Sequence, residues 1–175
     1  DQFRLDGKIA VVTGGGRGIG RGIALGLAEC GADVVVIARR QDDVDAVAKE
    51  IEARGQKGLG LSADVLDWQQ IPDALDTVVE EFGGLDIMVN NAGGNLDRET
   101  YALPDIPIDK FDEQLNLNMK SKFWGSQQAA KRMNDGGRII NIISIAAHKP
   151  SPGFGVYSAA NLGMISMTRT MAVEL

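Results

Sequence analysis

A glycine-rich turn of the kind that binds phosphate groups lies near the start of the chain. The segment TGGGRGIG at residues 13–20 falls between a short apolar run at residues 8–13 and an apolar pattern with helical spacing. Glycines placed there permit a tight turn, let backbone N–H groups approach a pyrophosphate and allow the helix to pack closely on the strand. Because a strand precedes it and a helix follows it, the segment is predicted to bind a dinucleotide rather than to be a flexible turn.

The composition excludes several other kinds of chemistry. The chain has 18 basic and 24 acidic side chains, a net charge of −6, without any block of Lys or Arg. Nucleic acids and anionic membrane surfaces bind clustered positive charge, so neither is expected as a partner. The single cysteine, Cys30, cannot form an internal disulfide, and the single histidine, His148, cannot build a His/Cys metal site. We therefore expect no metal.

The ends of the sequence and its apolar runs bear on location. Runs such as residues 34–38 are far too short to span a bilayer, and the first residues do not resemble a signal peptide. A cytoplasmic protein is expected. The sequence begins with Asp1 and stops inside a helical pattern at Leu175, so we expect both ends to be cut.

Two alternating patterns predict the elements that would position the glycine turn. Apolar or β-branched runs predict five strands, at residues 8–13, 33–38, 59–63, 85–90 and 138–144. Helical spacing predicts helices between them, including a long one over residues 109–134, and a last helix over residues 157–175. The expected fold is α/β, a doubly wound (Rossmann) parallel sheet with helices on both faces and strand order 3-2-1-4-5, forming one domain over residues 1–175.

Two helices carry apolar residues at a spacing of four, which predicts stripes that pack on neighbours. The first stripe consists of Ile19, Ile23 and Leu27. The second consists of Phe111, Leu115, Met119 and Phe123 in the long helix. The residues of that helix expected in the core or at a subunit interface are Phe111, Met119, Phe123 and Met133.

Further motifs occur at the ends of the predicted strands and in the long helix. They are Thr13-Gly14-x3-Gly18-x-Gly20, Asp64-Val65, Asn90-Asn91-Ala92-Gly93, Asn118, Ser144, and Tyr157 thirteen residues later. With these motifs the sequence, from Leu5 to its last residue, resembles the short-chain dehydrogenase/reductase family. The resemblance implies that the dinucleotide is a nicotinamide cofactor, and that further strands would follow the present sequence.

The end of the second strand bears on which cofactor is used. A carboxylate there usually holds the ribose 2′-hydroxyl of NAD(H), whereas Arg or Lys pairs with the 2′-phosphate of NADP(H). The sequence has Ala38 followed by Arg39 and Arg40, and Arg17 adds a cation in the glycine turn. NADP(H) is therefore preferred. NAD(H) is the alternative if Arg39 and Arg40 are only solvated loop charges.

By resemblance, Asp64 would bond the adenine amine, Val65 would cover the ring, and Asn91 with Gly93 would line the adenosine ribose. Asn90 and Asn91 could equally be turn residues that bond their own backbone. The expected cofactor-binding residues are Gly14, Gly16, Arg17, Gly18, Ile19, Gly20, Arg39, Arg40, Asp64, Val65, Asn91, Ala92 and Gly93.

The resemblance also implies an oxidoreductase that transfers a hydride between the cofactor and a secondary alcohol or ketone. Because the cofactor supplies the hydride, the protein must deliver a proton to the developing alkoxide. By resemblance, Tyr157 is the general acid/base, Ser144 bonds the substrate oxygen, and Asn118 holds a water that continues the proton path.

One position departs from the family pattern. The family has a lysine four residues after the tyrosine, where this sequence has Asn161. A cation about 4 Å from a phenol, in an effective dielectric near 20, stabilises the phenolate by roughly 4 kcal/mol, which a neutral amide cannot do. Asn161 could still donate to a ribose hydroxyl. We expect turnover lower by orders of magnitude, and the alternative hypothesis is a dinucleotide-binding protein without appreciable catalysis.

Three further expectations concern surfaces. The resemblance implies a homodimer or homotetramer built through two long helices, to which Trp124 could contribute. The loop at residues 95–107 could form one wall of the substrate pocket through Leu96, Tyr101 and Leu103. The fifth strand is apolar on both faces at residues 139–143 and is expected to form an exposed edge.

Overall fold

The strands form one parallel sheet with the expected order. The computed structural model describes residues 3–95, 101–149 and 151–175, so Leu96 lies outside the described residues. The order is β3-β2-β1-β4-β5, and every neighbouring pair is parallel, which confirms the prediction. The strands are β1 (Ile9–Thr13), β2 (Asp33–Ala38), β3 (Gly58–Ser62), β4 (Ile87–Asn90) and β5 (Arg138–Asn141).

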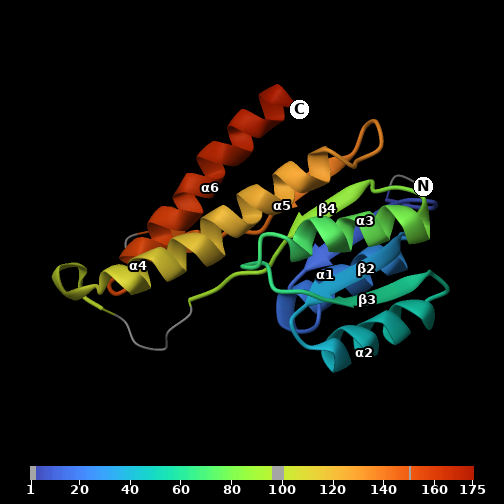
Figure 1. Cartoon of the computed structure of the whole chain (residues 1–175), viewed down its shortest axis with the longest axis horizontal. Coiled ribbons are helices and arrows are strands. Elements are labelled where there is room, and N and C mark those ends of the chain that lie inside the picture. The colour runs from blue at the N-terminus through green and yellow to red at the C-terminus, as the bar shows by residue number, and fades with distance from the viewer. Residues whose placement is uncertain (1–2, 96–100, 150) are drawn as a thin grey trace.

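Helices alternate with the strands and cover both faces of the sheet (Figure 1). One core cluster packs α1 and α2 on the sheet, and the other packs α3 and part of α5 on the opposite face. Neighbouring residues of a strand point to opposite faces, so Val11 belongs to the second cluster and Val12 to the first. The helices are α1 (Gly18–Glu29), α2 (Gln41–Glu52), α3 (Gln70–Phe82), α4 (Ile108–Leu115), α5 (Ser121–Ala130) and α6 (Gly155–Glu174), with single turns η1 (Leu103–Asp105), η2 (Asn116–Lys120) and η3 (Ile145–Ala147).

Helix α1 does not bury the apolar stripe that its sequence predicts. Ile19 is 72% exposed, whereas Ile23 and Leu27 are only partly buried. The residues of α1 that are fully buried are small or lie elsewhere on the helix, including Ala24 and Ala28. Small side chains let α1 approach the sheet closely, and this orientation leaves Ile19 at the mouth of the cavity described below.

The predicted long helix is one continuous rod with a change of winding in its middle. The turn η2, between α4 and α5, is a π-helix and contains the buried Asn118. The predicted apolar stripe is not the buried face, since Phe111 is exposed. The buried face is polar instead and consists of Gln114, Asn118, Ser121, Lys122, Ser126 and Gln128, with Gly125 and Ala129. Hydrogen bonds to the end of β4 and to the loop after it offset the cost of burying these polar groups.

Helix α6 lies beside α4 and α5, and α4 extends away from the sheet (Figure 1). A polar network ties α6 to the body: Asn90 Nδ2 donates to Ser126 Oγ and Asn141 Oδ1, each at 3.0 Å, and Asn141 Nδ2 donates to Thr168 Oγ1 at 3.0 Å. These four side chains join β4, α5, β5 and α6. Asn90 is therefore a structural residue of the sheet edge.

Strand β5 is the last strand of the described sheet, and its outward-facing apolar side chain is exposed as expected, whereas Ile139 packs on the second core cluster. Ile140 is 45% exposed, and Ile143, just past the strand, is 36% exposed. Trp124 is partly buried: it packs on the second core cluster, and its Nε1 donates to the carbonyl of Trp68 at 2.8 Å. None of the helices in the described residues combines the length and the apolar character that a membrane span needs.

Candidate functional site

A cavity of about 680 Å³ opens at the carboxyl ends of the strands, where the order of the sheet reverses between β1 and β4. Its wall includes every one of the 13 residues predicted to bind a cofactor. Asn118 from η2, and Tyr157 and Asn161 from α6, also line it. The fold thus brings residues from seven segments of the chain to one hollow.

The glycine turn forms the floor of the cavity. Gly14 and Gly18 have φ angles of +65° and +56°, which glycine adopts readily and other residues rarely do. The N–H of Gly14 donates to the carbonyl of Ile37 at 2.7 Å, which fixes the turn to β2. No side chain caps the start of α1. The turn therefore has the geometry that binds a phosphate at a helix N-terminus.

Substitution of Gly20 tests how closely this turn is packed. A Cβ at Gly20 would overlap the carbonyl oxygen of Gly14 and lie 2.5 Å from Asn91 Nδ2. We expect Gly20→Ala to destabilise the protein by about 2–3 kcal/mol and to abolish nucleotide binding, because the backbone of Gly14 would have to move to relieve the overlap. Gly22→Ala is the matched control: it lies in the same helix with open space around it and should stabilise by up to about 1 kcal/mol. Urea unfolding of both variants measures the difference, and equal stabilities would contradict it.

The loop after β4 is tied to the glycine turn through Thr13. The N–H groups of Asn91 and Ala92 both donate to Thr13 Oγ1 at 3.1 Å, and Asn91 Nδ2 donates to the Thr13 carbonyl at 2.9 Å. The Asn91 amide thus holds the loop after β4 to the glycine turn, rather than bonding its own backbone. Gly93, two residues later, lies in the cavity wall without a side chain.

Asp64, Arg39 and Arg40, which follow the ends of β3 and β2, also line the cavity. One Asp64 oxygen accepts from the N–H of Leu66 at 3.0 Å, which shapes the turn after β3. Arg39 and Arg40 are exposed, and Arg40 is 3.4 Å from a carboxylate oxygen of Asp43. Arg39 lines the cavity, and no carboxylate of the described residues lies within 4.0 Å of its guanidinium.

Asn118 is buried, and both polar atoms of its side chain make hydrogen bonds within the protein. Its Nδ2 donates to the carbonyl of Gly94 at 2.9 Å and to Gln114 Oε1 at 2.9 Å, while its Oδ1 accepts from the N–H of Gly94 at 2.8 Å. This pair of bonds clamps the Gly94 peptide to η2. The amide therefore positions the loop after β4.

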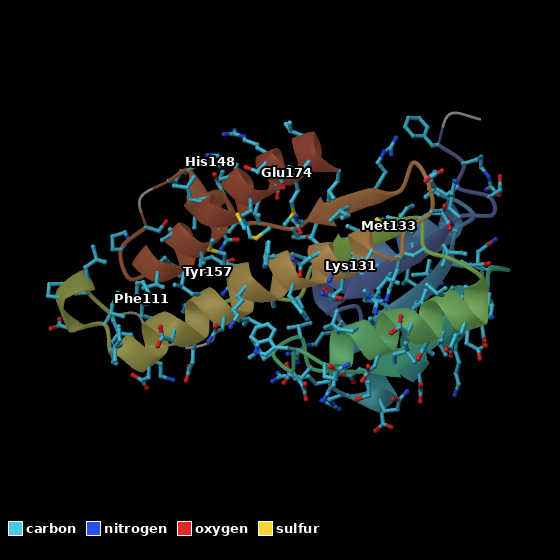
Figure 2. All side chains as sticks on the ribbon, turned by 45° about the horizontal axis from the view of Figure 1, so that its top comes forward. Phe111, Lys131, Met133, His148, Tyr157 and Glu174 are labelled. Atoms are coloured by element: carbon cyan, nitrogen blue, oxygen red, sulfur yellow. The ribbon has the colours of Figure 1, made fainter. Side chains whose placement is uncertain are left out.

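Tyr157 lies near the start of α6, where α6 runs beside α4 (Figure 2). It is half-buried and packs edge-to-face on Phe154, with ring centroids 6.1 Å apart. Asn161, one helical turn later, is 1% exposed, and its Nδ2 donates to the carbonyl of Tyr157 at 2.8 Å. The Asn161 amide is thus turned back onto its own helix.

Ser144 is the predicted site residue that does not line the cavity. It is the N-cap of η3, and its Oγ accepts from the N–H of Ala146 at 3.2 Å. The hydroxyl hydrogen is still available for donation, since only the oxygen is engaged in this bond.

Lys122 lines the cavity but was not predicted. It is 3% exposed, and its Nζ donates to the backbone carbonyl of Asn118 at 3.3 Å. Burial lowers the pKa of Lys122 to about 8 because it penalises the charged form. Its position four residues after Asn118, on the same helix face, was the one signal that the sequence offered.

Comparison with known proteins places this site in a family. A family model described as short chain dehydrogenase matches residues 8–175. The chain belongs to the short-chain dehydrogenase family. Within the described residues of this short-chain dehydrogenase, no three His, Cys, Asp or Glu side chains gather as a metal site would require.

Several members of the short-chain dehydrogenase family are similar over nearly the whole chain. The 2-dehydro-3-deoxy-D-gluconate 5-dehydrogenase of Escherichia coli is 42% identical over 98% of the chain and 67% of its own length. Versicolorin reductase 1 of Dothistroma septosporum is 38% identical over 99% of the chain and 66% of its own length. The chain thus spans about two thirds of the length of these curated relatives.

Solved structures of short-chain dehydrogenases show the same fold. A short-chain dehydrogenase from Burkholderia cenocepacia, solved in complex with NADP, has a TM-score of 0.91 and 40% identity, covering 98% of this chain and 70% of the other. A short-chain dehydrogenase/reductase from Serratia marcescens has a TM-score of 0.92 and 40% identity, covering 98% of this chain and 69% of the other.

Proposed function

We propose that this protein is an oxidoreductase that transfers a hydride between NADP(H) and a secondary alcohol or ketone. The observation that carries the proposal is that Tyr157 lines the same cavity as the glycine turn. A proton donor and a phosphate-binding turn in one hollow are the two parts that such a reaction needs from the protein. The family and its named dehydrogenases and reductases support the reaction class.

The residues present fit a nicotinamide dinucleotide. The glycine turn has no room for side chains at Gly20, and the start of α1 has no side-chain cap, so backbone donors would hold the pyrophosphate. Asp64 and Val65 would hold the adenine, and Ile19 would cover the pyrophosphate at the mouth of the cavity. When bound, the nicotinamide would supply or accept the hydride.

In the proposed mechanism Tyr157 donates its hydroxyl proton to the alkoxide oxygen that develops on a ketone substrate, and removes it in the reverse direction. Ser144 donates its hydroxyl hydrogen to the same substrate oxygen. Asn118 acts as a positioning residue, because it clamps the Gly94 peptide on the cavity wall. Asn161 supplies no charge, so the tyrosine phenolate lacks a cation one helical turn away.

Tyr157→Phe tests the proposal with little change in shape. We expect the variant to bind NADPH as the unchanged protein does and to lose its ketone-dependent NADPH oxidation, because only the hydroxyl is removed. Nucleotide fluorescence titration and a screen of ketones and secondary alcohols measure the two properties. Unchanged oxidation rates in the variant would overturn the role of Tyr157.

A second candidate function is dinucleotide binding without appreciable catalysis. Asn161 favours it, because the buried position next to Tyr157 carries no cation. The same screen separates the two candidates: nucleotide binding without turnover on any substrate supports the second.

The preference for NADP(H) over NAD(H) is proposed from the exposed cations and supported by the NADP complex of the Burkholderia relative. We expect Arg39→Ala to weaken NADPH binding about 10- to 100-fold and to change NADH binding by less than about twofold, because only NADPH has a 2′-phosphate. Arg54→Ala is the control, since Arg54 pairs with Glu29 at 3.1 Å outside the cavity. Equal losses for both nucleotides would contradict the assignment.

We also propose that the protein forms homodimers or homotetramers through its long helices. The half-exposed apolar residues on these helices support an interface, with Phe111 at 39% and Leu162 at 52% exposure. Sedimentation velocity measures the oligomeric state directly.

A further inference from the structure

Lys122 is a buried ammonium group for which the fold provides few partners. It lies in α5, and its only hydrogen bond among the described residues is the one to the Asn118 carbonyl at 3.3 Å. No carboxylate of the described residues lies within 4.0 Å of Nζ. An ammonium carries three N–H donors, so two of them have no acceptor in the described structure.

The position of Nζ shows where those two donors can reach. A Cβ built on Gly93 would lie 2.7 Å from Lys122 Nζ and 2.9 Å from Asn118 Oδ1. The absence of a side chain at Gly93 therefore makes room for the ammonium at the cavity wall. Lys122 also borders a small recess lined by Val65 and Ala92, two residues that line the cavity as well.

A buried charge without a partner is unfavourable in the unliganded protein. Taking an ammonium out of water costs several kcal/mol unless other groups replace its hydration. An apolar side chain of the same length would fill this place without that penalty. A group that destabilises the fold and faces a cavity is best explained by a ligand that completes its hydrogen bonds.

We propose that Lys122 binds the adenosine half of the dinucleotide, by donating its two remaining N–H groups to oxygen atoms of the adenosine ribose. This inference rests on the proposed function, since it needs a nucleotide in the cavity. The ribose is favoured because Nζ lies next to Gly93, which is expected to line the adenosine ribose, whereas Arg39 and Arg40 are the cations proposed for a 2′-phosphate. Lys122 is thus a binding residue that holds the buried side of the nucleoside.

Calorimetric titration with nucleotide fragments tests the proposal. ADP-ribose and ADP contain the adenosine half, whereas nicotinamide mononucleotide contains only the other half. We expect Lys122→Met to weaken ADP-ribose and ADP about 10- to 100-fold and to leave the mononucleotide within about twofold, because two charge-assisted bonds are lost. Lys120→Met is the matched control: Lys120 is exposed, stacks on Trp68 and does not line the cavity.

The outcomes separate this inference from the proposed function. If the unchanged protein binds no nucleotide, both are overturned. If it binds ADP-ribose and Lys122→Met binds it equally well, the inference alone is overturned. An equal loss for ADP-ribose and the mononucleotide also overturns it, because it would indicate a general change of the cavity. Circular dichroism and thermal melting of the unliganded variants verify that each is folded.

Discussion

Replacing Asn161 with lysine should raise the rate of ketone-dependent NADPH oxidation about 100-fold or more. Asn161 lines the cavity one helical turn from Tyr157 and is 1% exposed, so a lysine there would place its ammonium beside the phenol. At about 4 Å and an effective dielectric near 20, the cation would stabilise the phenolate by roughly 4 kcal/mol. Even half of that energy in the transition state corresponds to about 30-fold, and most of it to about 1000-fold.

Steady-state assays at pH 7 measure this effect. Asn161→Met is the matched control, because methionine has nearly the length of lysine and no charge. It also removes the bond from Asn161 Nδ2 to the Tyr157 carbonyl. The double variant Asn161→Lys, Tyr157→Phe should lose the gain, since the cation acts through the tyrosine. Equal rates for the lysine and methionine variants would show that charge at this position does not limit turnover.

Replacing Lys122 with methionine should stabilise the unliganded protein by about 3 kcal/mol at pH 7. The pKa of Lys122 is lowered to about 8 in the folded protein, against 10.5 for an ordinary lysine. A difference of about 2.5 units corresponds to roughly 3 kcal/mol. Below pH 8 both folded and unfolded states carry the charge, so the full penalty of burying it acts on the folded state.

The extra stability of the Lys122→Met variant should disappear as the pH rises. Between pH 8 and 10.5 the unfolded state binds the proton more tightly, so the stability of the unchanged protein rises with pH. Above about 10.5 the amine is neutral in both states and the penalty is gone. Urea unfolding of both proteins from pH 7 to 10.5 tests this, and only their difference is used because other groups titrate in both. If the stability difference between the two proteins did not change with pH, the lowered pKa of Lys122 would be refuted.

Much of the fold could be predicted, because strands that are buried on both faces of a sheet consist mainly of apolar residues. Residues 33–38 form β2 as predicted, and the strand order is as expected, because parallel strands require apolar runs and crossover helices. The residues expected to bind a cofactor lie in one cavity because the segments that carry them follow the carboxyl ends of strands, and all such ends meet at one edge of the sheet.

The parts that could not be predicted depend on polar side chains. Apolar spacing does not mark the buried face of the long helix, because that face is polar and is held by hydrogen bonds from residues such as Asn118 and Ser126. Lys122 was missed for the same reason, since lysine is ordinarily a solvent-exposed residue. Ser144 caps η3, and this role depends on loop geometry that spacing does not encode.

The polar network that joins Asn90, Asn141 and Thr168 means that α6 is attached to the sheet edge through a few directional bonds rather than a broad apolar interface. Its fully buried residues are confined to its first half and include Val156 and Met164. Such a helix can open locally while the sheet with the glycine turn stays folded. We therefore expect the exposed second half of α6 to open locally more readily than the sheet with the glycine turn and than the first half, which carries Tyr157.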